Sequence, residues 1–276
     1  MKNFAIFLTI LTLLFIQNLK SQNLIENFSD GDYLGWLDLM YNGTDSWTVE
    51  NEQLHFSYNS PEETAAVLVS PVGAVSDFTF EMYVGYLDVS DWCNEVGVGR
   101  YSDIADTYIY WRIDAEEGIL ELGYNDGSGN VDLYTETLSV NPGLGFFPLK
   151  LSVSGTAPTL TITAWWDGIQ KWSGNISNAS EALSHGHIAI VVSNHASTAV
   201  SGWIDNINIT YQEYISSIPN LIENFSDGDY LGWLDLMYNG TGSWAVENEQ
   251  LHFSYNSPEE TAAVLVSPVG AVSDFT

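Results

Sequence analysis

The sequence predicts an all-β fold, a two-sheet antiparallel β-sandwich of the jelly-roll kind. Three observations carry this prediction: apolar and polar residues alternate with period two over many short runs, turn dipeptides separate several of these runs, and helical periodicity is nearly absent. Ten or more short strands in about 190 residues favour two packed sheets. The chain is 45% hydrophobic and 13% aromatic, which is enough apolar surface to bury a core.

Residues 1–22 are expected to be a secretory signal peptide. Lys2 supplies the positive start, and an almost purely apolar run follows from Phe4 to Ile16. This run is shorter than the roughly 20 residues that span a bilayer, and no later apolar stretch is longer. We therefore expect cleavage near Ser21 or Gln22, no membrane span, and a protein that is secreted or held at the cell surface.

The charge of the chain is strongly negative. The sequence holds 36 acidic and 6 basic residues, and removal of Lys2 and Lys20 with the signal leaves 36 against 4, a formal charge of −32. Such a surface repels phosphate backbones, so we expect no nucleic-acid partner. It suits divalent cations and a saline medium, although solubility alone is the simpler interpretation. Cys93 is the single cysteine, which excludes an intramolecular disulfide.

An internal repeat defines the domain organisation. Asn220–Thr276 repeats Asn23–Thr79 at an offset of 197 residues (220 − 23) with two differences, Gly242 for Asp45 and Ala245 for Thr48. The period is too long for a solenoid and indicates tandem copies of a whole domain. We expect a complete β-sandwich domain at 23–214, a linker at 215–219, and at 220–276 the truncated N-terminal part of a near-identical second copy.

The strands of the complete copy are predicted from period-two runs, taken in chain order. The clearest runs lie at 78–84, 108–114, 149–153, 160–164, 187–193 and 203–211, and Asn178–Leu183 has weak helical character. Turn signals such as Asp126-Gly127 and Asp167-Gly168 lie between runs, as in hairpins. The core of the sandwich is expected to contain Phe80, Met82, Trp111, Leu151, Ile162, Ile190 and Ile207.

Three segments carry a resemblance to a known fold family: ENFSDGD followed by Trp36, the WWDG hairpin at 165–168, and WIDNINIT at 203–210. Together they resemble the concanavalin A-like lectin and glucanase jelly rolls, particularly the laminin-G-type modules of secreted Bacteroidota proteins. Members of this broad fold bind glycans, mediate adhesion or hydrolyse polysaccharides, and fold alone does not choose among these functions.

For a hydrolase, the resemblance implies a catalytic motif on one strand. Laminarinase-like members carry Glu, Asp and Glu at alternate positions of one strand, with the outer pair as nucleophile and acid/base. Here Asp114 and Glu116 match the second and third positions, but Arg112 occupies the first, and a guanidinium cannot attack. The sequence therefore predicts no enzyme activity, with a β-glucan type glycoside hydrolase and a ligand-free structural spacer as the alternatives.

The preferred function is a non-catalytic module that binds an extracellular glycan, repeated in tandem for avidity. Tyrosine rings stack on the C–H patches of sugars, while arginine and carboxylate groups hydrogen-bond to hydroxyls. The competing interpretation is that these are ordinary strand residues on a half-wet face. The predicted ligand-binding residues are Tyr83, Trp92, Tyr108, Tyr110, Arg112 and Asp114.

A structural calcium ion is predicted at Glu26 and Asp205. Asp205 shares its alternation with Ile207 and Ile209, so it is expected to point inward, where a carboxylate needs a partner and basic residues are scarce. The resemblance implies a calcium held by residues of the first and last strands, with backbone carbonyls completing the oxygen shell. The alternative is that Asp205 only accepts hydrogen bonds from backbone N–H groups, and the sequence favours this and the calcium site equally.

Overall fold

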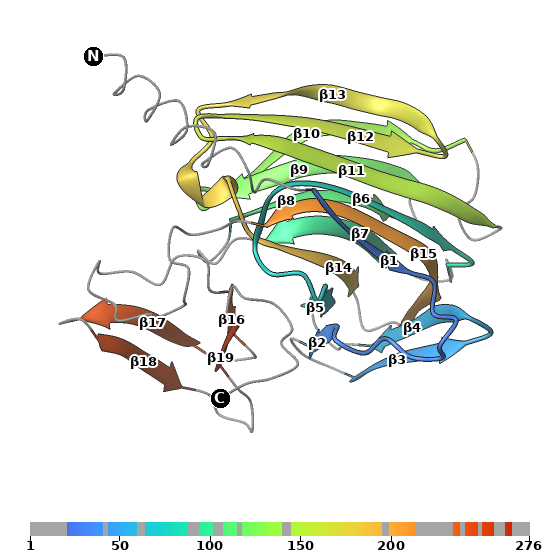
Figure 1. The fold of residues 1–276 in the computed structure, drawn as a ribbon, viewed down its shortest axis with the longest axis horizontal. Helices are drawn as coiled ribbons and strands as arrows, with labels where there is room; N and C mark the ends of the chain where they lie inside the picture. Colours follow the sequence, from blue (N-terminus) through green and yellow to red (C-terminus); the bar gives the residue numbers. More distant parts are fainter. Residues whose placement is uncertain are drawn as a thin grey trace, which may run out of the picture.

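The computed structural model of the chain describes residues 21–40, 44–59, 64–87, 94–101, 107–114, 118–139, 145–194, 199–213, 234–237, 241–247, 250–256 and 263–266. Figure 1 shows two β-sheets that lie against each other as two layers. All of their strand pairs are antiparallel. The predicted two-sheet antiparallel sandwich is therefore confirmed.

The first sheet, sheet A, has eight strands in the order β13-β12-β11-β6-β15-β4-β3, with β1 paired to β15 beside β4. The long strand β15 is central because β6 pairs with one of its edges, while β4 and β1 share the other edge. The strands are β1 (Gln22–Glu26), β3 (Thr44–Glu50), β4 (Gln53–Asn59), β6 (Val75–Gly85), β11 (Phe146–Thr156), β12 (Thr159–Trp166), β13 (Ile169–Ser177) and β15 (Ala199–Glu213).

The second sheet, sheet B, has seven strands in the order β10-β9-β8-β7-β14-β5-β2. Consecutive strands β7 to β10 pair as a meander, and β14 then returns to pair with β7 on one side and β5 on the other. The strands are β2 (Leu37–Met40), β5 (Thr64–Val69), β7 (Asn94–Tyr101), β8 (Thr107–Asp114), β9 (Ile119–Asp126), β10 (Asn130–Thr137) and β14 (His187–Asn194).

The hydrophobic core lies between the two sheets. Alternate residues of each strand point into it, so that in β8 Ile109, Trp111 and Ile113 are buried while their neighbours face away. All seven residues that the sequence places in the core are buried there: Phe80, Met82, Trp111, Leu151, Ile162, Ile190 and Ile207. Within the described residues, no helix is long and apolar enough to cross a membrane.

A buried arginine joins the two layers at one end of the sandwich. The Arg100 side chain is 1% exposed and donates hydrogen bonds to the backbone carbonyls of Ser76, Leu183 and Ser184. Two of these carbonyls end the short 3-10 helix η2 (Glu181–Leu183), and the third belongs to β6. Burial lowers the pKa of Arg100 to about 9, opposed by the nearby Asp77 charge. Arg100 therefore supports the fold rather than a ligand.

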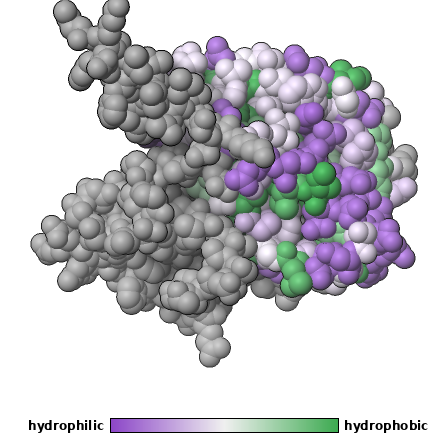
Figure 2. Space-filling view, in the orientation of Figure 1, coloured by the Kyte–Doolittle hydropathy of each residue, from purple (hydrophilic) through white to green (hydrophobic). Residues whose placement is uncertain are grey.

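The outer face of sheet A is mostly polar. Figure 2 shows the described residues of this side of the molecule as largely hydrophilic, with hydrophobic residues only in small patches. One exposed apolar side chain here is Ile25 of β1, which is 67% exposed. Lys150 pairs with Glu81 across β11 and β6 at 3.2 Å. This face has the alternation of a solvated sheet surface, which needs no ligand to explain it.

The repeated segment forms strand pairs like those of the first copy. Strand β16 (Leu234–Met237) pairs with β19 (Ala263–Val266), as β2 pairs with β5. Strand β17 (Thr241–Glu247) pairs with β18 (Gln250–Asn256), as β3 pairs with β4. Every residue pair of these two ladders has its equivalent 197 positions earlier. The division of the chain into domains and linker stays a proposal.

Candidate functional site

The candidate site lies on the outer face of sheet B. Strand β8 places Tyr108, Tyr110, Arg112 and Asp114 on this face because their neighbours Ile109, Trp111 and Ile113 point into the core. The adjacent strands β7 and β9 add Tyr101 opposite Tyr108, and Glu121 opposite Arg112. We call the set Tyr101, Tyr108, Tyr110, Arg112 and Glu121 the tyrosine face.

Three aromatic rings form a continuous row on the tyrosine face. The rings of Tyr101 and Tyr108 are stacked, with centroids 5.4 Å apart and planes 29° apart. The ring of Tyr110 follows 6.0 Å from that of Tyr108. Tyr101 and Tyr108 are partly exposed, whereas Tyr110 is only 7% exposed. The row therefore offers two accessible rings that rest on a third, buried one.

A cation continues the row beyond the rings. The guanidinium of Arg112 lies 4.8 Å from the centroid of the Tyr110 ring. Its Nε donates to Glu121 Oε2 at 2.8 Å, and its Nη2 lies 2.6 Å from the same oxygen. About a third of each side chain remains exposed, 32% for Arg112 and 28% for Glu121. The ion pair thus keeps both charges at the surface in a fixed orientation.

Polar side chains of β10 hold the hydroxyls of two tyrosines. The hydroxyl of Tyr108 donates to Asn130 Oδ1 at 2.9 Å, and that of Tyr110 donates to Asp132 Oδ1 at 3.3 Å. Burial raises the pKa of Tyr110 far above its usual value, and the carboxylates of Asp132 and Glu121 raise it further while Arg112 opposes them. Tyr110 therefore stays a neutral hydrogen-bond donor throughout the physiological range.

Glycines make room for the rings. A Cβ on Gly123 would lie 2.4 Å from the hydroxyl oxygen of Tyr110, so this ring lies across β9 where the strand has no side chain. A Cβ on Gly99 would lie 3.2 Å from the Tyr101 ring and 2.5 Å from the carbonyl oxygen of Ile109. The close packing of the tyrosine row on the sheet therefore depends on glycine in two strands.

The structure separates the residues predicted to bind ligand. Tyr108, Tyr110 and Arg112 are together on the tyrosine face, and Asp114 shares its strand face but is 6% exposed. Tyr83 does not join them: it lies on β6 of sheet A, opposite Pro148 and Asp205, and faces the other side of the sandwich. Tyr83 therefore cannot share a binding face with Tyr108 and Tyr110, because β6 and β8 belong to different sheets.

Other sequence predictions lie elsewhere. Trp92, Cys93 and Glu116 lie outside the described residues. Of the adjacent pair in β12, Trp166 is buried and Trp165 is partly exposed beneath the Lys150 ammonium at 5.3 Å. Alternation alone predicts that adjacent strand residues face opposite sides, and the structure agrees.

Sequence reasoning missed Tyr101 and Glu121. The sequence does carry a signal for Glu121, because the dipeptide Glu117-Gly118 is typical of a turn between two strands. A hairpin about that turn pairs β8 with β9 and sets Arg112 opposite Glu121, as the structure has it. Tyr101 carried no such signal, since its pairing with Tyr108 depends on the connection between β7 and β8.

Asp205 does not point inward as expected. A β-bulge in β15 inserts an extra residue between Asp205 and Asn208 relative to β6, and Asn206 in it has a positive φ of 51°. Ile204 and Ile207 are therefore both buried, while Asp205 lies on the outer side with Tyr83. Its carboxylate accepts from the Asn206 backbone N–H at 2.7 Å and from Gln53 Nε2 at 3.3 Å.

The calcium site stays a prediction. Glu26 pairs with Ile207 and accepts the Phe28 N–H at 2.7 Å, so the ladder sets it on the face opposite Asp205. The described residues contain no group of three or more His, Cys, Asp or Glu side chains placed to hold a metal ion. The bond from the Asn206 N–H to Asp205 is the kind of contact that the alternative interpretation of Asp205 expects.

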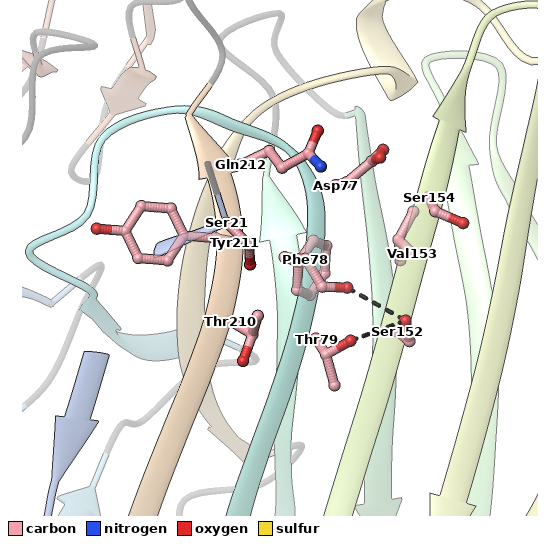
Figure 3. Close-up of a pocket in the computed structure, with 10 residues that line it drawn as sticks. All are labelled: Ser21, Asp77, Phe78, Thr79, Ser152, Val153, Ser154, Thr210, Tyr211 and Gln212. Carbon is pink, nitrogen blue, oxygen red and sulfur yellow. Dashed lines mark hydrogen bonds between the residues drawn. The ribbon is translucent and has the colours of Figure 1, made fainter. Parts of the chain in front are cut away.

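A small pocket lies on the outer face of sheet A, away from the tyrosine face. Figure 3 shows its lining residues on β15, β6 and β11, with Ser21 at its rim. Its volume is about 140 Å³, and its floor consists of hydroxyl side chains that bond to one another, Thr79 to Ser152 at 3.0 Å and Ser152 to the Phe78 carbonyl at 3.3 Å. Internally paired hydroxyls of this kind explain the pocket as part of the sheet surface.

Comparison with known proteins shows the fold. No family model and no curated protein matches the chain. A β-glucanase from Bacillus licheniformis matches at a TM-score of 0.51 and 12% identity, covering 71% of this chain and 100% of that chain. A laminarinase from Flavobacterium sp. UMI-01 matches at 0.50 and 12%, covering 70% and 100%. A protein of unknown function with a galectin-like fold from Bacillus subtilis matches at 0.50 and 11%, covering 70% and 98%.

The chain therefore has the concanavalin A-like jelly-roll fold, as the resemblance implied. The same comparison overturns the prediction that the chain is not an enzyme. Structures that share its fold are named as a β-glucanase and a laminarinase, so the absence of one strand motif is no ground for denying catalysis. Hydrolysis stands beside binding as an activity of this fold.

Proposed function

We propose that the protein is an extracellular carbohydrate-binding jelly roll that holds a glycan on the tyrosine face. The observation that carries this proposal is the ordered row of Tyr101, Tyr108 and Tyr110, continued by the exposed Arg112–Glu121 pair. Aromatic faces pack on the C–H face of a pyranose, and a fixed arginine–carboxylate pair offers both donors and acceptors to ring hydroxyls. Each ring is already held in place, so little conformational entropy is lost on binding.

The charge of the molecule favours a neutral glycan. The chain carries a net charge of −30, and in the tyrosine face the guanidinium of Arg112 is already paired with Glu121. A sulfated or uronic polysaccharide would be repelled by such a surface. The names of the matching structures suggest β-glucans, so laminarin is the first glycan to test.

The experiment is calorimetric titration of the protein with laminarin oligosaccharides, a second neutral glycan and a sulfated polysaccharide. The account expects binding to a neutral glycan and none to the sulfated one at physiological salt. Binding to the sulfated polysaccharide alone, or to none of the neutral glycans in a broader panel, would count against the tyrosine face as a glycan site.

Hydrolysis is the second candidate, and one arrangement favours it. Asp114 pairs with Ile119 and Arg112 with Glu121, so Asp114 and Glu121 are diagonal neighbours on one face of β8 and β9. The backbones of diagonal neighbours lie ~7–8 Å apart, so their side chains can reach the carboxyl separation of inverting glycosidases, which is ~6.5–9.5 Å. Arg112 occupies the position of the nucleophile in the strand motif of β8 and has no carboxylate. Glu121 of the neighbouring strand β9 provides one on the same face.

Release of reducing ends from laminarin tests this candidate. A rate that falls at least about a hundredfold in both Glu121→Gln and Asp114→Asn, with folding unchanged, would establish catalysis through this pair. A rate that is unaffected by either change would remove the pair from any catalytic role. The calorimetric binding measurement is independent of this result.

We also propose that the protein acts outside the cell. The apolar run Phe4–Ile16 has the length and flanks of a signal sequence. Repetition of the domain would then raise the avidity for a polymer with many equivalent sites, because the second contact becomes intramolecular. The N-terminus of the secreted protein, determined by mass spectrometry, should lie near Ser21 or Gln22.

A further inference from the structure

The first strands of the chain close one end of both sheets. Strands β1 and β4 share one edge of β15 in sheet A, with β3 beyond β4, and strand β5 pairs with β14 in sheet B, with β2 beyond it. This terminal segment, residues 22–69, contributes several fully buried side chains to the core, among them Phe28, Leu54, Phe56 and Leu68. The edges of β14 and β15 therefore form a continuous docking surface for one N-terminal segment.

The chain contains a second segment with the same docking residues. Phe225, Leu251, Phe253 and Leu265 stand where the first copy has its buried side chains. Of the two differences, Thr48 is partly exposed, on the outer face opposite His55, and Asp45 lies in the hairpin strand β3. Neither substitution removes a buried apolar group that the terminal segment supplies to the core.

The second segment is already arranged for docking. Its strand pairs β16–β19 and β17–β18 keep the register of β2–β5 and β3–β4, and in the described part of the chain each is a two-stranded sheet. Among the described residues, β18 therefore has no partner on the edge by which β4 pairs with β15, and β19 has none on the edge by which β5 pairs with β14. Unpaired edges of this kind pair with a matching strand when one is accessible.

The chain connection also fits. Strand β15 ends at Glu213, and β1 runs antiparallel to it from Gln22 opposite Tyr211. Pro219 stands at the position equivalent to Gln22. The residues between Tyr211 and Pro219, of which Gln212 and Glu213 still belong to β15, would turn the chain back along β15 as a β-hairpin. Asn220 would then lie opposite Thr210, where Asn23 now accepts a hydrogen bond from the Thr210 hydroxyl at 3.2 Å.

We propose that residues 220–266 exchange with residues 22–69 for the open edges of β14 and β15, so that the sandwich has two interchangeable N-terminal segments. Only the chain before Ser70–Ala74, the connection between β5 and β6, leaves its place in the exchange. Strand β6 and the later strands of both sheets stay where they are. The second form has the connectivity of a circular permutant, and its core is chemically the same as that of the first. This inference does not depend on the proposed function.

A competition between two disulfides in the full chain tests the exchange. The variant carries Asn23→Cys, Thr210→Cys and Asn220→Cys together with Cys93→Ser, so the thiol at position 210 pairs with position 23 or with position 220. The side chains of Asn23 and Thr210 already meet across the ladder, which brings their backbones within the reach of a disulfide. Peptide mass spectrometry of monomeric protein, equilibrated in a glutathione buffer, gives the ratio of the two disulfides.

Two matched variants make the ratio diagnostic. Leu54→Ala weakens docking of the first segment, and Leu251→Ala weakens docking of the second at the equivalent position. Deletion of a buried leucine side chain should change the ratio of 210–220 to 210–23 disulfide more than tenfold, upward in Leu54→Ala and downward in Leu251→Ala. Leu54→Ala keeps an intact second segment, so the proposal expects it to remain folded.

The proposal is supported if both disulfides form within monomers and the two leucine variants shift their ratio in opposite directions. It is overturned if the 210–220 disulfide occurs only in linked dimers, or if its yield does not respond to Leu54→Ala. It is also overturned if Leu54→Ala unfolds the chain as completely as the double variant Leu54→Ala/Leu251→Ala does, because the second segment would then give no rescue.

Discussion

Single residues set the chemistry of the tyrosine face, and Tyr110 is the one that joins its parts. Its ring lies under the Arg112 guanidinium, its hydroxyl bonds to Asp132, and burial keeps it neutral. The partly exposed Tyr101 and Tyr108 can act on a ligand only because Tyr110 and the strand glycines fix where the row lies. Tyr110 thus supports the row of rings, whereas Tyr101 and Tyr108 are available to contact the ligand.

Two tyrosines with raised pKa values, Tyr110 and Tyr134, give the stability a pH dependence of known sign. The pKa of Tyr110 is raised by burial, and that of Tyr134 is raised to about 12, first by burial and then by its hydrogen bond to Glu136. Above a pH of about 10 the unfolded chain loses these protons while the folded chain keeps them, so the free energy of unfolding falls as pH rises. This stability is fully present below a pH of about 10.

Urea denaturation at pH 9, 10 and 11 measures this effect. The free energy of unfolding should fall with pH in the wild type, and the fall should be smaller in Tyr110→Phe, which cannot ionise. An equal pH slope in Tyr110→Phe and wild type would contradict a raised pKa at this position.

At the scale of strands and turns, period-two alternation predicted the fold but not the partners of each strand. It placed Phe80, Trp111 and Ile207 in the core correctly, since inward residues are apolar whichever sheet holds them. It could not show that Tyr83 and Tyr108 belong to different sheets, because that depends on long-range pairing. It also failed at Asp205, where one extra residue in β15 reverses the faces.

The packing of β9 against the tyrosine row gives a prediction for Gly123. In Gly123→Ala the new methyl group would lie 2.4 Å from the Tyr110 hydroxyl oxygen, so the ring must move off the strand. We expect glycan affinity to fall by about tenfold, equivalent to about 1.4 kcal/mol, through the displaced support for Tyr108 and Arg112.

Gly129→Ala is the matched control, because a Cβ there meets no atom within 4 Å, although its φ of 134° favours glycine. It should cost stability without affecting affinity. Calorimetric titration of both variants checks this expectation, and equal affinity for Gly123→Ala and wild type would show that Tyr110 plays no part in binding.

Arg100 gives a prediction for the joint between the sheets and η2. Arg100→Met should lower the free energy of unfolding by about 3 kcal/mol, because three buried carbonyls lose their donor while the desolvation of the charge is relieved. For a domain of this size that corresponds to a fall in Tm of about 6–12 °C.

The control for Arg100 is Lys150→Met, which removes a partly exposed ion pair with Glu81. Its free energy of unfolding should stay within about 1 kcal/mol of the wild type. Thermal and urea denaturation of both variants measure the difference. A similar small effect of the two changes would contradict a structural role for Arg100.

At the scale of the whole molecule, the two sides of the sandwich differ in kind. The outer face of sheet A carries the Lys150–Glu81 ion pair and the bonded hydroxyls of Thr79 and Ser152, whereas the outer face of sheet B carries the aromatic row and the exposed Arg112–Glu121 pair. The net charge of the chain is strongly negative and disfavours anionic glycans. Among neutral glycans, we expect the stacking surface of the tyrosine face to determine which one binds.

The central claim is that the tyrosine face of sheet B binds the glycan, and a pair of tyrosine substitutions tests it most directly. Tyr108→Ala removes an accessible ring from this face, while Tyr83→Ala removes a tyrosine that is 36% exposed on the opposite side. Calorimetric titration with the preferred neutral glycan should show affinity about tenfold weaker for Tyr108→Ala and unchanged for Tyr83→Ala. Unchanged affinity in Tyr108→Ala, with the loss appearing instead in Tyr83→Ala, would contradict the account and move the site to sheet A.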